Sequence, residues 1–295
     1  ARSAYRKALE RDRFDPPTWH NLGISLADLG DWAGSARADR KSIQYGPSEE
    51  AWYCLGLSLI KLEKYSGAEA AFREALEHNY NSPLAWLFMG DTLRYRGLHA
   101  RAENEYLKSL DLDSSNPDAW NKLGISLELQ GRHPEAIEAY FEAAARDPEW
   151  CLPWNNLGMS RERERLYPEA RGAYQQSITI DCSYAPAWKN LARIEHYLGS
   201  EDRALEAYRK YLEIEPDDYR VWCDLADIFY RQENYLNAEE AYRAAIKIDR
   251  KDPTTWFYLS YALRYQGCAD KLKEAERAAR RAINLQPDKS TRRAA

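Results

Sequence analysis

The chain has 295 residues, of which 44% are apolar, and a formal net charge of −5. This composition supplies enough apolar material for a continuous core, while the net charge and the absence of a long basic run exclude nonspecific nucleic-acid binding, which needs a concentrated positive field. No run of about 18 apolar residues occurs, so the sequence contains no membrane-spanning segment.

The first element predicted along the chain is a helix within residues 1–15. Ala1, Tyr5 and Ala8 have the spacing of one helical face, and they match the second helix of a repeating unit whose first helix is missing. At the other end, Ile283 and Leu285 finish a second helix, and only polar residues follow. Because no capping helix is visible at either end, we expect a piece of a longer protein, or ends that pack on something.

A pattern that begins with tryptophan then recurs eight times. Its copies are separated by 33 residues once and by 34 residues six times, starting at Trp19, Trp52, Trp86, Trp120, Trp154, Trp188, Trp222 and Trp256. A fixed period of this length indicates a stack of similar supersecondary units. Such a stack replaces the two globular domains that the chain length alone suggests.

One unit, residues 117–150, shows how the repeat is built. Trp120 and Leu127 are seven residues apart, with further apolar residues between them, and therefore share one helical face. Gly131 is suited to the end of that helix, and Pro134 to the start of a second one. The second helix repeats the helical spacing with Ala136, Tyr140, Ala143 and Ala144. Each unit is thus predicted to be a helix–turn–helix hairpin that buries its apolar face by stacking.

The order tryptophan, leucine, glycine, large apolar residue, alanine, aromatic, alanine, proline resembles the tetratricopeptide repeat (TPR) family. Other units keep the same frame with Ala68, Phe72 and Ala75, with Ala204 and Tyr208, and with Ala238, Tyr242 and Ala245. The resemblance covers nearly the whole chain. It implies an all-α fold, an α-solenoid in which stacked helix–turn–helix units form a right-handed superhelix and the first helices line a concave groove. We expect a partial repeat at 1–15, eight tandem units at 16–287 and a polar tail at 288–295.

Two units depart from the frame. The first has Ser35, Asp39 and Ser42 where alanine, an aromatic residue and alanine are expected, so its second helix matches weakly. The eighth carries three extra residues around Cys268–Lys271 before the frame resumes at Ala275.

The cysteines indicate neither disulfides nor a metal site. They are Cys54, Cys151, Cys182, Cys223 and Cys268. None forms a CxxC pair, and no histidine lies near enough in sequence to complete a zinc site. An odd, scattered set is typical of reduced thiols, and no secretory or transit signal opens the chain, so we expect a cytoplasmic location.

Function is predicted on the free face of the first helices, where the copies of the repeat differ most. At 100° per residue, the second, fifth, sixth, ninth, twelfth and thirteenth places of each unit point away from the tryptophan stripe, and the resemblance implies that they line the groove. The residues expected to bind a partner there are Asn121, Asn155, Asn156, Arg163, Lys189, Asn190, Arg193, Asp224, Asp227, Tyr230, Tyr258, Tyr261 and Tyr265.

Asparagines form the first feature of this face. Asn21, Asn156 and Asn190 hold the sixth place of their units, and a primary amide both donates and accepts hydrogen bonds. A ladder of amides can hold an extended peptide backbone whatever its sequence, and this one resembles, incompletely, the asparagine ladder of O-linked N-acetylglucosamine transferase. The alternative is a set of solvated asparagines near helix starts.

A short basic strip is the second feature. Arg163, Lys189 and Arg193 could receive a carboxylate, which predicts an acidic partner, unless Asp224 and Asp227 simply neutralise them. No three consecutive units reproduce the two-carboxylate clamp of chaperone adaptors in the family, which argues against a chaperone C-terminal tail as the ligand.

Tyrosines in the last two units are the third feature. Tyr230, Tyr258, Tyr261 and Tyr265 combine an apolar ring with a polar tip and are suited to partner recognition, although some could belong to the core.

No catalytic motif accompanies these features. The sequence has no GxGxxG, Walker loop, HExxH or GxSxG, so we expect no enzyme activity, no cofactor and no metal. The leading interpretation is a protein–protein interaction scaffold that binds an extended peptide or a partner helix. The alternatives are a structural subunit that self-associates through its chain ends into a homo-oligomer, and the substrate-selecting arm of a larger enzyme. The fold alone does not identify the partner or the pathway.

Overall fold

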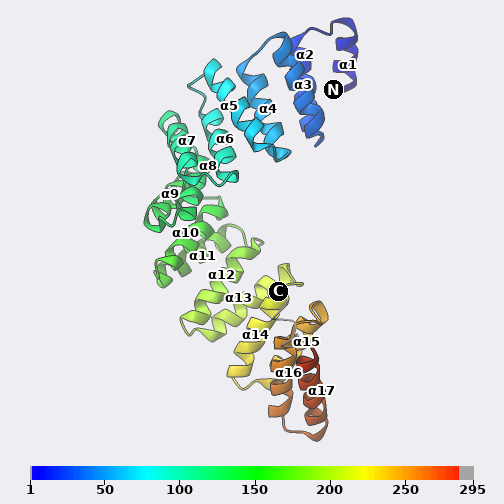
Figure 1. The fold of residues 1–295 in the computed structure, drawn as a ribbon. Helices are drawn as coiled ribbons and strands as arrows, with labels where there is room; N and C mark the ends of the chain where they lie inside the picture. The colour runs from blue at the N-terminus through cyan, green and yellow to red at the C-terminus, as the bar shows by residue number, and fades with distance from the viewer. Residues whose placement is uncertain (1, 286–295) are drawn as a thin grey trace, which may run out of the picture. The chain divides into compact units, whose positions relative to one another are not determined.

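A computed structural model describes residues 2–285, and its helices follow the predicted repeat (Figure 1). A first helix, α1 (Arg2–Arg11), precedes eight helix–turn–helix hairpins in this part of the chain. The hairpins are, in order, α2 (Pro16–Ala27) with α3 (Trp32–Tyr45), α4 (Glu49–Lys61) with α5 (Tyr65–His78), α6 (Pro83–Tyr95) with α7 (His99–Leu112), α8 (Pro117–Leu129) with α9 (His133–Arg146), α10 (Cys151–Arg163) with α11 (Tyr167–Ile180), α12 (Ala185–Tyr197) with α13 (Glu201–Ile214), α14 (Tyr219–Arg231) with α15 (Tyr235–Ile248), and α16 (Pro253–Tyr265) with α17 (Ala269–Leu285). The prediction of an all-α solenoid of hairpins is confirmed.

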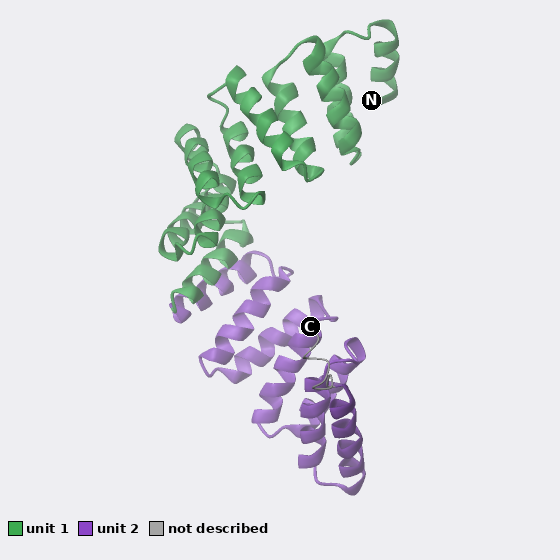
Figure 2. Cartoon of the chain, in the orientation of Figure 1, with its two compact units in different colours: residues 1–165 green, residues 166–295 purple. Residues whose placement is uncertain are grey.

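The helices form two compact units, Ala1–Arg165 and Leu166–Ala295 (Figure 2). We number the hairpins 1 to 8 and call the first helix of each the A helix and the second the B helix. Within each unit, an A helix packs against its own B helix and against the B helix before it. The right-handed superhelix and the division at residues 15 and 287 stay predictions. The polar tail at 288–295 lies outside the described residues. None of the described helices has the length and apolar character needed to cross a membrane.

Four of the A helices begin at an aspartate or asparagine that caps them. The carboxylates and amide of Asp15, Asn116, Asp218 and Asp252 accept hydrogen bonds from backbone N–H groups of the first helical turn. These bonds satisfy donors that have no partner inside the helix.

A left-handed residue ends each A helix. Gly131 has φ 77°, and four other glycines hold the equivalent place in their hairpins. Glu63, Arg165 and Glu233 adopt the same conformation, with φ 58°, 60° and 57°, although they carry side chains. The turn therefore requires positive φ at this place in every hairpin, and three hairpins achieve it without glycine.

A glycine in the A helix brings it close to the aromatic ring of its B helix. A Cβ atom built on Gly56 would lie 2.6 Å from the ring of Phe72, and one on Gly124 would lie 2.6 Å from the ring of Tyr140. Both rings are fully buried. The close approach therefore depends on the missing side chain.

Most of the repeated tryptophans tie their A helix to the linker that precedes it. In six hairpins, the indole N–H donates to the backbone carbonyl six residues earlier, as between Trp120 and Ser114 at 2.9 Å and between Trp222 and Pro216 at 2.9 Å. The ring is half-buried, or buried in the case of Trp86, and its N–H satisfies a linker carbonyl.

Hairpin 1 replaces the core ring by a carboxylate, as its departure from the frame suggests. Asp39 is 0% exposed, and its oxygens lie 3.4 Å from Nδ1 of His20 and 3.4 Å from Oγ of Ser35, which donates to the carboxylate. The Ser58 hydroxyl donates to Ser35 at 2.9 Å. Burial raises the pKa of Asp39 despite the hydrogen bond and the charge interaction with His20.

Candidate partner-binding surface

Unit 1 contains four of the predicted partner-binding residues, and two of these are not at the surface. Asn121 and Asn155 are each only 3% exposed, which corrects the expectation that they face the groove. Both hold the fifth place of their units, which Leu87 also holds at 2% exposed, whereas His20 and Tyr53 at the same place are half-buried. Asn156 donates from Nδ2 to Oδ1 of Asn121 at 3.0 Å, so these amides join hairpins instead of forming an open ladder.

A buried carboxylate, Asp91, organises the A-helix face of hairpins 3 and 4. Its oxygens accept a hydrogen bond from the Tyr106 hydroxyl at 2.8 Å and one from Nζ of Lys122 at 2.6 Å. Burial alone would lower the pKa of Lys122, but Asp91 and Asp118 raise it above its ordinary value. The lysine therefore stays charged and is committed to a partner within the protein.

Arg163, predicted to belong to a basic strip, also has an acidic neighbour. Its Nε lies 3.4 Å from Oε1 of Glu128, whose other oxygen accepts a hydrogen bond from the Tyr140 hydroxyl at 2.9 Å. The side chain of Arg163 is 59% exposed, so this pair is screened by solvent and holds the guanidinium weakly.

A shared rule connects these contacts. The hydroxyl of a buried tyrosine on a B helix donates a hydrogen bond to a carboxylate on an A helix, as Tyr106 does to Asp91 and Tyr242 does to Asp227. A buried tyrosine hydroxyl needs such an acceptor. The signal was present in the sequence as tyrosine at the aromatic place of the B helix combined with an acid at the ninth or twelfth place of the A helix.

In unit 2, Lys189 is paired. Its Nζ lies 2.7 Å from Oδ2 of Asp218, which also accepts from the Tyr211 hydroxyl at 2.9 Å. Burial would raise the pKa of Asp218, but the hydrogen bonds from Lys189 and Tyr211 lower it below its usual range. The acid that pairs directly with Lys189 is therefore Asp218, the capping residue of α14, while the charge of Lys189 also acts on Asp224, one of the two aspartates expected from the sequence.

Two aspartates lie together on α14. Asp224 has a pKa raised to about 6, first by burial of its carboxyl group and then by the charge of Asp227, while Lys189 and Arg193 act in the opposite direction. Asp227 accepts a hydrogen bond from the Tyr242 hydroxyl. Near neutral pH the pair thus offers carboxylate oxygens next to the positive charge of Arg193.

Tyrosines gather beside these acids. Tyr235 stacks on Tyr265 with ring centroids 5.2 Å apart, and Tyr230 meets Tyr265 edge to face at 6.0 Å. On α16, Tyr258, Tyr261 and Tyr265 are 41%, 36% and 57% exposed. The predicted tyrosines are thus brought together on α14 and α16, and those on α16 present part of their rings to solvent.

A histidine and an arginine form one more contact on this face. Nη1 of Arg231 lies 2.8 Å from Nε2 of His196. Burial, and then the charge of Arg231, lower the pKa of His196, so its ring is neutral near pH 7 and Nε2 accepts from the guanidinium.

These groups provide hydrogen bonds, charge pairs and ring contacts. No cluster of three or more histidine, cysteine or acidic side chains suited to a metal ion occurs among the described residues. The fold and this surface define a helical-repeat protein whose A helices carry polar and aromatic side chains.

The particular family follows from comparison with known families. A tetratricopeptide repeat model matches residues 53–117, 87–149, 155–219 and 189–254, which together make up more than half of the chain. The chain belongs to the tetratricopeptide repeat family, whose fold is typically a non-catalytic scaffold. None of the curated proteins compared with it matches the chain.

Solved structures share the fold. A crystal structure of MamA is 25% identical and covers 55% of this chain and 95% of its own, with a TM-score of 0.53. The C-terminal part of a TPR repeat-containing protein from Cytophaga hutchinsonii is 15% identical and covers 80% of this chain and 97% of its own, with a TM-score of 0.68. YrrB, described as a TPR protein with an unusual peptide-binding site, is 19% identical and covers 63% of this chain and 97% of its own, with a TM-score of 0.53.

Proposed function

We propose that the chain is a protein-interaction scaffold and that the A-helix face of unit 2 binds a peptide or partner helix. The observation that carries this proposal is the group of exposed tyrosines on α16 beside the paired aspartates on α14. Rings with a polar tip are frequent anchors of protein interfaces. The family and the peptide-binding site named for YrrB support a peptide as the class of ligand.

In the binding mode we propose, the rings and the acids have different roles. Tyr258, Tyr261 and Tyr265 pack against apolar side chains of the partner, and their partial exposure leaves area for that contact. Asp224 and Asp227 accept hydrogen bonds from backbone or basic side chains of the partner. The tyrosines and the aspartates can contact one partner together, because α14 and α16 are both A helices of unit 2.

The charge of the partner divides this proposal into two forms. An acidic partner would have to compete with Asp218 for Lys189, which pairs with it at 2.7 Å, and with Asp224 for Arg193, whose charge acts on that carboxyl group. A basic partner would be held by Asp224 and Asp227. A basic partner receives more support, because Asp224 and Asp227 both lie on α14. The basic residues of the predicted strip are divided, since Arg163 lies in unit 1 and the other two lie in unit 2.

A peptide selection tests the proposal. Random peptides displayed on phage are selected against the full chain, and the strongest binder is titrated against wild type and against Tyr261→Ala/Tyr265→Ala. We expect about a tenfold loss of affinity or more for the double variant, since truncation of an aromatic anchor costs about 1 to 2 kcal/mol. Leu236→Ala is the matched control, because Leu236 is 65% exposed and lies on α15, a B helix of the same unit. Equal losses in the two variants would refute the tyrosine site.

The same binder identifies its charge partner. Arg193→Glu should weaken an acidic peptide, and Asp224→Asn a basic one. Because the pKa of Asp224 is about 6, affinity for a basic peptide should fall between pH 7 and pH 5 as this carboxylate gains its proton. An affinity that stays constant over that range argues against the basic form.

A further inference from the structure

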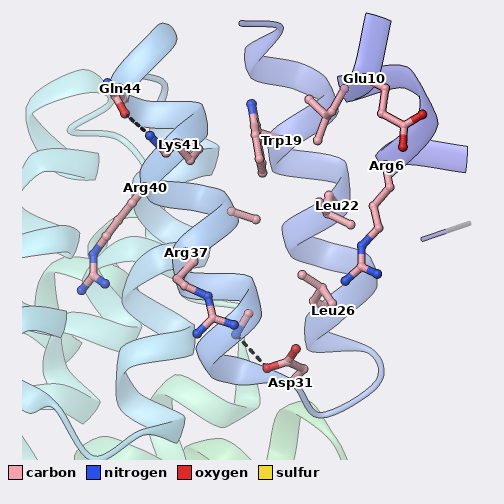
Figure 3. A pocket seen from close by; sticks show the side chains of 13 residues that line it. Arg6, Glu10, Trp19, Leu22, Leu26, Asp31, Arg37, Arg40, Lys41 and Gln44 are labelled. Carbon is pink, nitrogen blue, oxygen red and sulfur yellow. Dashed lines mark hydrogen bonds between the residues drawn. The ribbon is translucent and has the colours of Figure 1, made fainter. Parts of the chain in front are cut away.

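A hollow in unit 1, on the side of the B helices, is separate from the A-helix face. It has a volume of about 710 Å³ and lies between α1 and α3, above α2 (Figure 3). Trp19, Leu22 and Leu26 line its floor, and Leu9 of α1, which belongs to the same apolar cluster, also lines it. A volume of this size falls within the range of ligand pockets, about 300 to 1,000 Å³.

The rim of this hollow is basic. Its charged side chains are Arg6, Arg37, Arg40 and Lys41, against Glu10 and Asp31. Arg40 points away from the floor in Figure 3, and Nζ of Lys41 donates to the Gln44 side chain at 2.8 Å. The excess is positive, whereas the whole chain has a net charge of −5. Figure 3 shows Arg6 reaching over the floor from α1 and Arg37 approaching from α3. One of the two acids is already engaged, since Asp31 accepts a hydrogen bond from the backbone N–H of Gly34 at 2.7 Å.

The rim cations of α1 and α3 form no ion pair across the hollow, whereas the arginines of two equivalent grooves do. In the equivalent groove between α7 and α9, Arg132 at the N-cap of α9 pairs with Glu103 of α7 at 2.6 Å. In the groove between α15 and α17, Arg243 pairs with Glu274. No ion pair joins α1 to α3 within the described residues, so Arg6 and Arg37 are left to the solvent.

The form of an occupant follows from the surroundings of the hollow. Its walls are helices, whose backbone groups bond internally, so they offer no ladder to an extended strand. A helical ligand satisfies its own backbone and presents an apolar stripe to the floor and side chains to the rim. The apolar floor also favours a protein ligand over a nucleic acid, whose outer surface is charged.

We propose that the groove between α1 and α3 binds an amphipathic helix of a partner protein, with an apolar stripe over Trp19, Leu22 and Leu26 and acidic side chains facing Arg6, Arg37 and Lys41. This site does not depend on the proposed function of unit 2, because it uses other helices and a ligand of defined charge. Charge complementarity selects the ligand and the apolar floor holds it.

A biased peptide library tests this site. Helical peptides of 14 residues, the length of α3, carry a fixed leucine stripe and flanks with equal shares of Glu, Lys, Gln and Ala. They are selected on the full chain and on Arg37→Glu/Lys41→Glu. We expect the wild type to enrich Glu over Lys in the flanks by about tenfold, and the affinity of the best peptide to fall about tenfold in the variant.

The chain provides a matched control. Arg277 and Arg281 have the same spacing on α17 and line the equivalent groove there. Arg277→Glu/Arg281→Glu should bind the selected peptide as the wild type does, and all three proteins should melt alike. Hydrogen exchange with the peptide bound should slow in α2 and α3.

Several results would overturn the proposal. These are a selection without enriched binders, flanks with no excess of Glu, and a peptide that binds Arg37→Glu/Lys41→Glu as tightly as wild type. Phosphatidylserine vesicles and a short DNA duplex are titrated in parallel. If either binds through Arg37 and Lys41 while no helical peptide is selected, the rim recognises phosphate and the helix proposal is wrong.

Discussion

Hairpins 1 and 4 build the same contact with opposite chemistry. In hairpin 4 the A helix passes over the ring of Tyr140 at Gly124, and in hairpin 1 it passes over the carboxylate of Asp39 at Gly23. An added Cβ would lie 2.6 Å from its neighbour in both cases. The backbone geometry of the repeat therefore does not depend on the aromatic ring. The glycine of the A helix and the packing of neighbouring hairpins maintain it around Asp39 as well as around Tyr140.

The energies should differ much more than the geometry, and removal of the side chain measures this. Tyr140→Ala should lower the free energy of unfolding by about 4 kcal/mol, because a fully buried ring is lost and a cavity remains. Asp39→Ala should cost at least about 2 kcal/mol less, since it also relieves a buried carboxylate. Urea unfolding followed by circular dichroism measures both, and equal losses would show that Asp39 is as important to the core as the ring.

Filling the contact is the next largest test. Gly124→Ala should destabilise by about 2 kcal/mol, because the buried ring of Tyr140 has no space to move. Gly23→Ala should cost less, since the nearest atom is the end of the Asp39 side chain, which can rotate. The same unfolding experiment applies, and a larger cost at Gly23 would mean that the carboxylate is held rigidly by His20 and Ser35.

The buried acid should also make hairpin 1 sensitive to pH. Burial raises the pKa of Asp39 in the folded protein above its ordinary value of 3.8, so the folded state binds more protons over that interval. Stability contributed by this group is therefore present at low pH and lost as pH rises towards the raised value. Asp39→Asn should gain stability relative to wild type as pH increases from 4 to 8. A constant difference over that range would contradict a raised pKa. Two other ionisable groups face this site. His20 contacts Asp39, and Glu50 lies close enough that its charge and that of Asp39 both raise the pKa of Cys54.

The smallest effect concerns the left-handed turns, where hairpins 2 and 4 differ. Glu63→Gly should stabilise by about 1 kcal/mol, since φ is 58° and a side chain is disfavoured there. Gly131→Ala should destabilise by a similar amount, because its φ of 77° is unfavourable for alanine. An added Cβ would meet no other atom within 4 Å, so the cost comes from the backbone alone. Thermal melting of both variants tests this, and shifts of the same sign would refute it.

The sequence predicts the fold well because each hairpin repeats one local pattern. Trp120, Gly124 and Tyr140 identify the two helices and their contact without any long-range information. Even the three extra residues of the eighth unit have a simple result, since α17 has 17 residues where α15 has 14.

The candidate surface is harder to predict. A helical period places Asn121 and Tyr261 on the same type of face, but it does not say which places the neighbouring hairpin covers, and Asn121 is buried. The pairing of Lys189 with Asp218 was also missed, because Asp218 is 29 residues away, at the cap of the next hairpin. Such contacts depend on how side chains lean between hairpins, which a one-dimensional pattern does not contain.

The bond between tryptophan and linker, present in six hairpins, has a mechanical consequence. Under tension applied to the two ends of the chain, a hairpin is held to the preceding linker by a half-buried ring and a hydrogen bond, as for Trp120 and Ser114 at 2.9 Å. Rupture should therefore proceed by whole repeats, each 33 or 34 residues long. At about 3.4 Å per extended residue, every event would lengthen the chain by roughly 115 Å, giving a regular sawtooth in a force–extension trace.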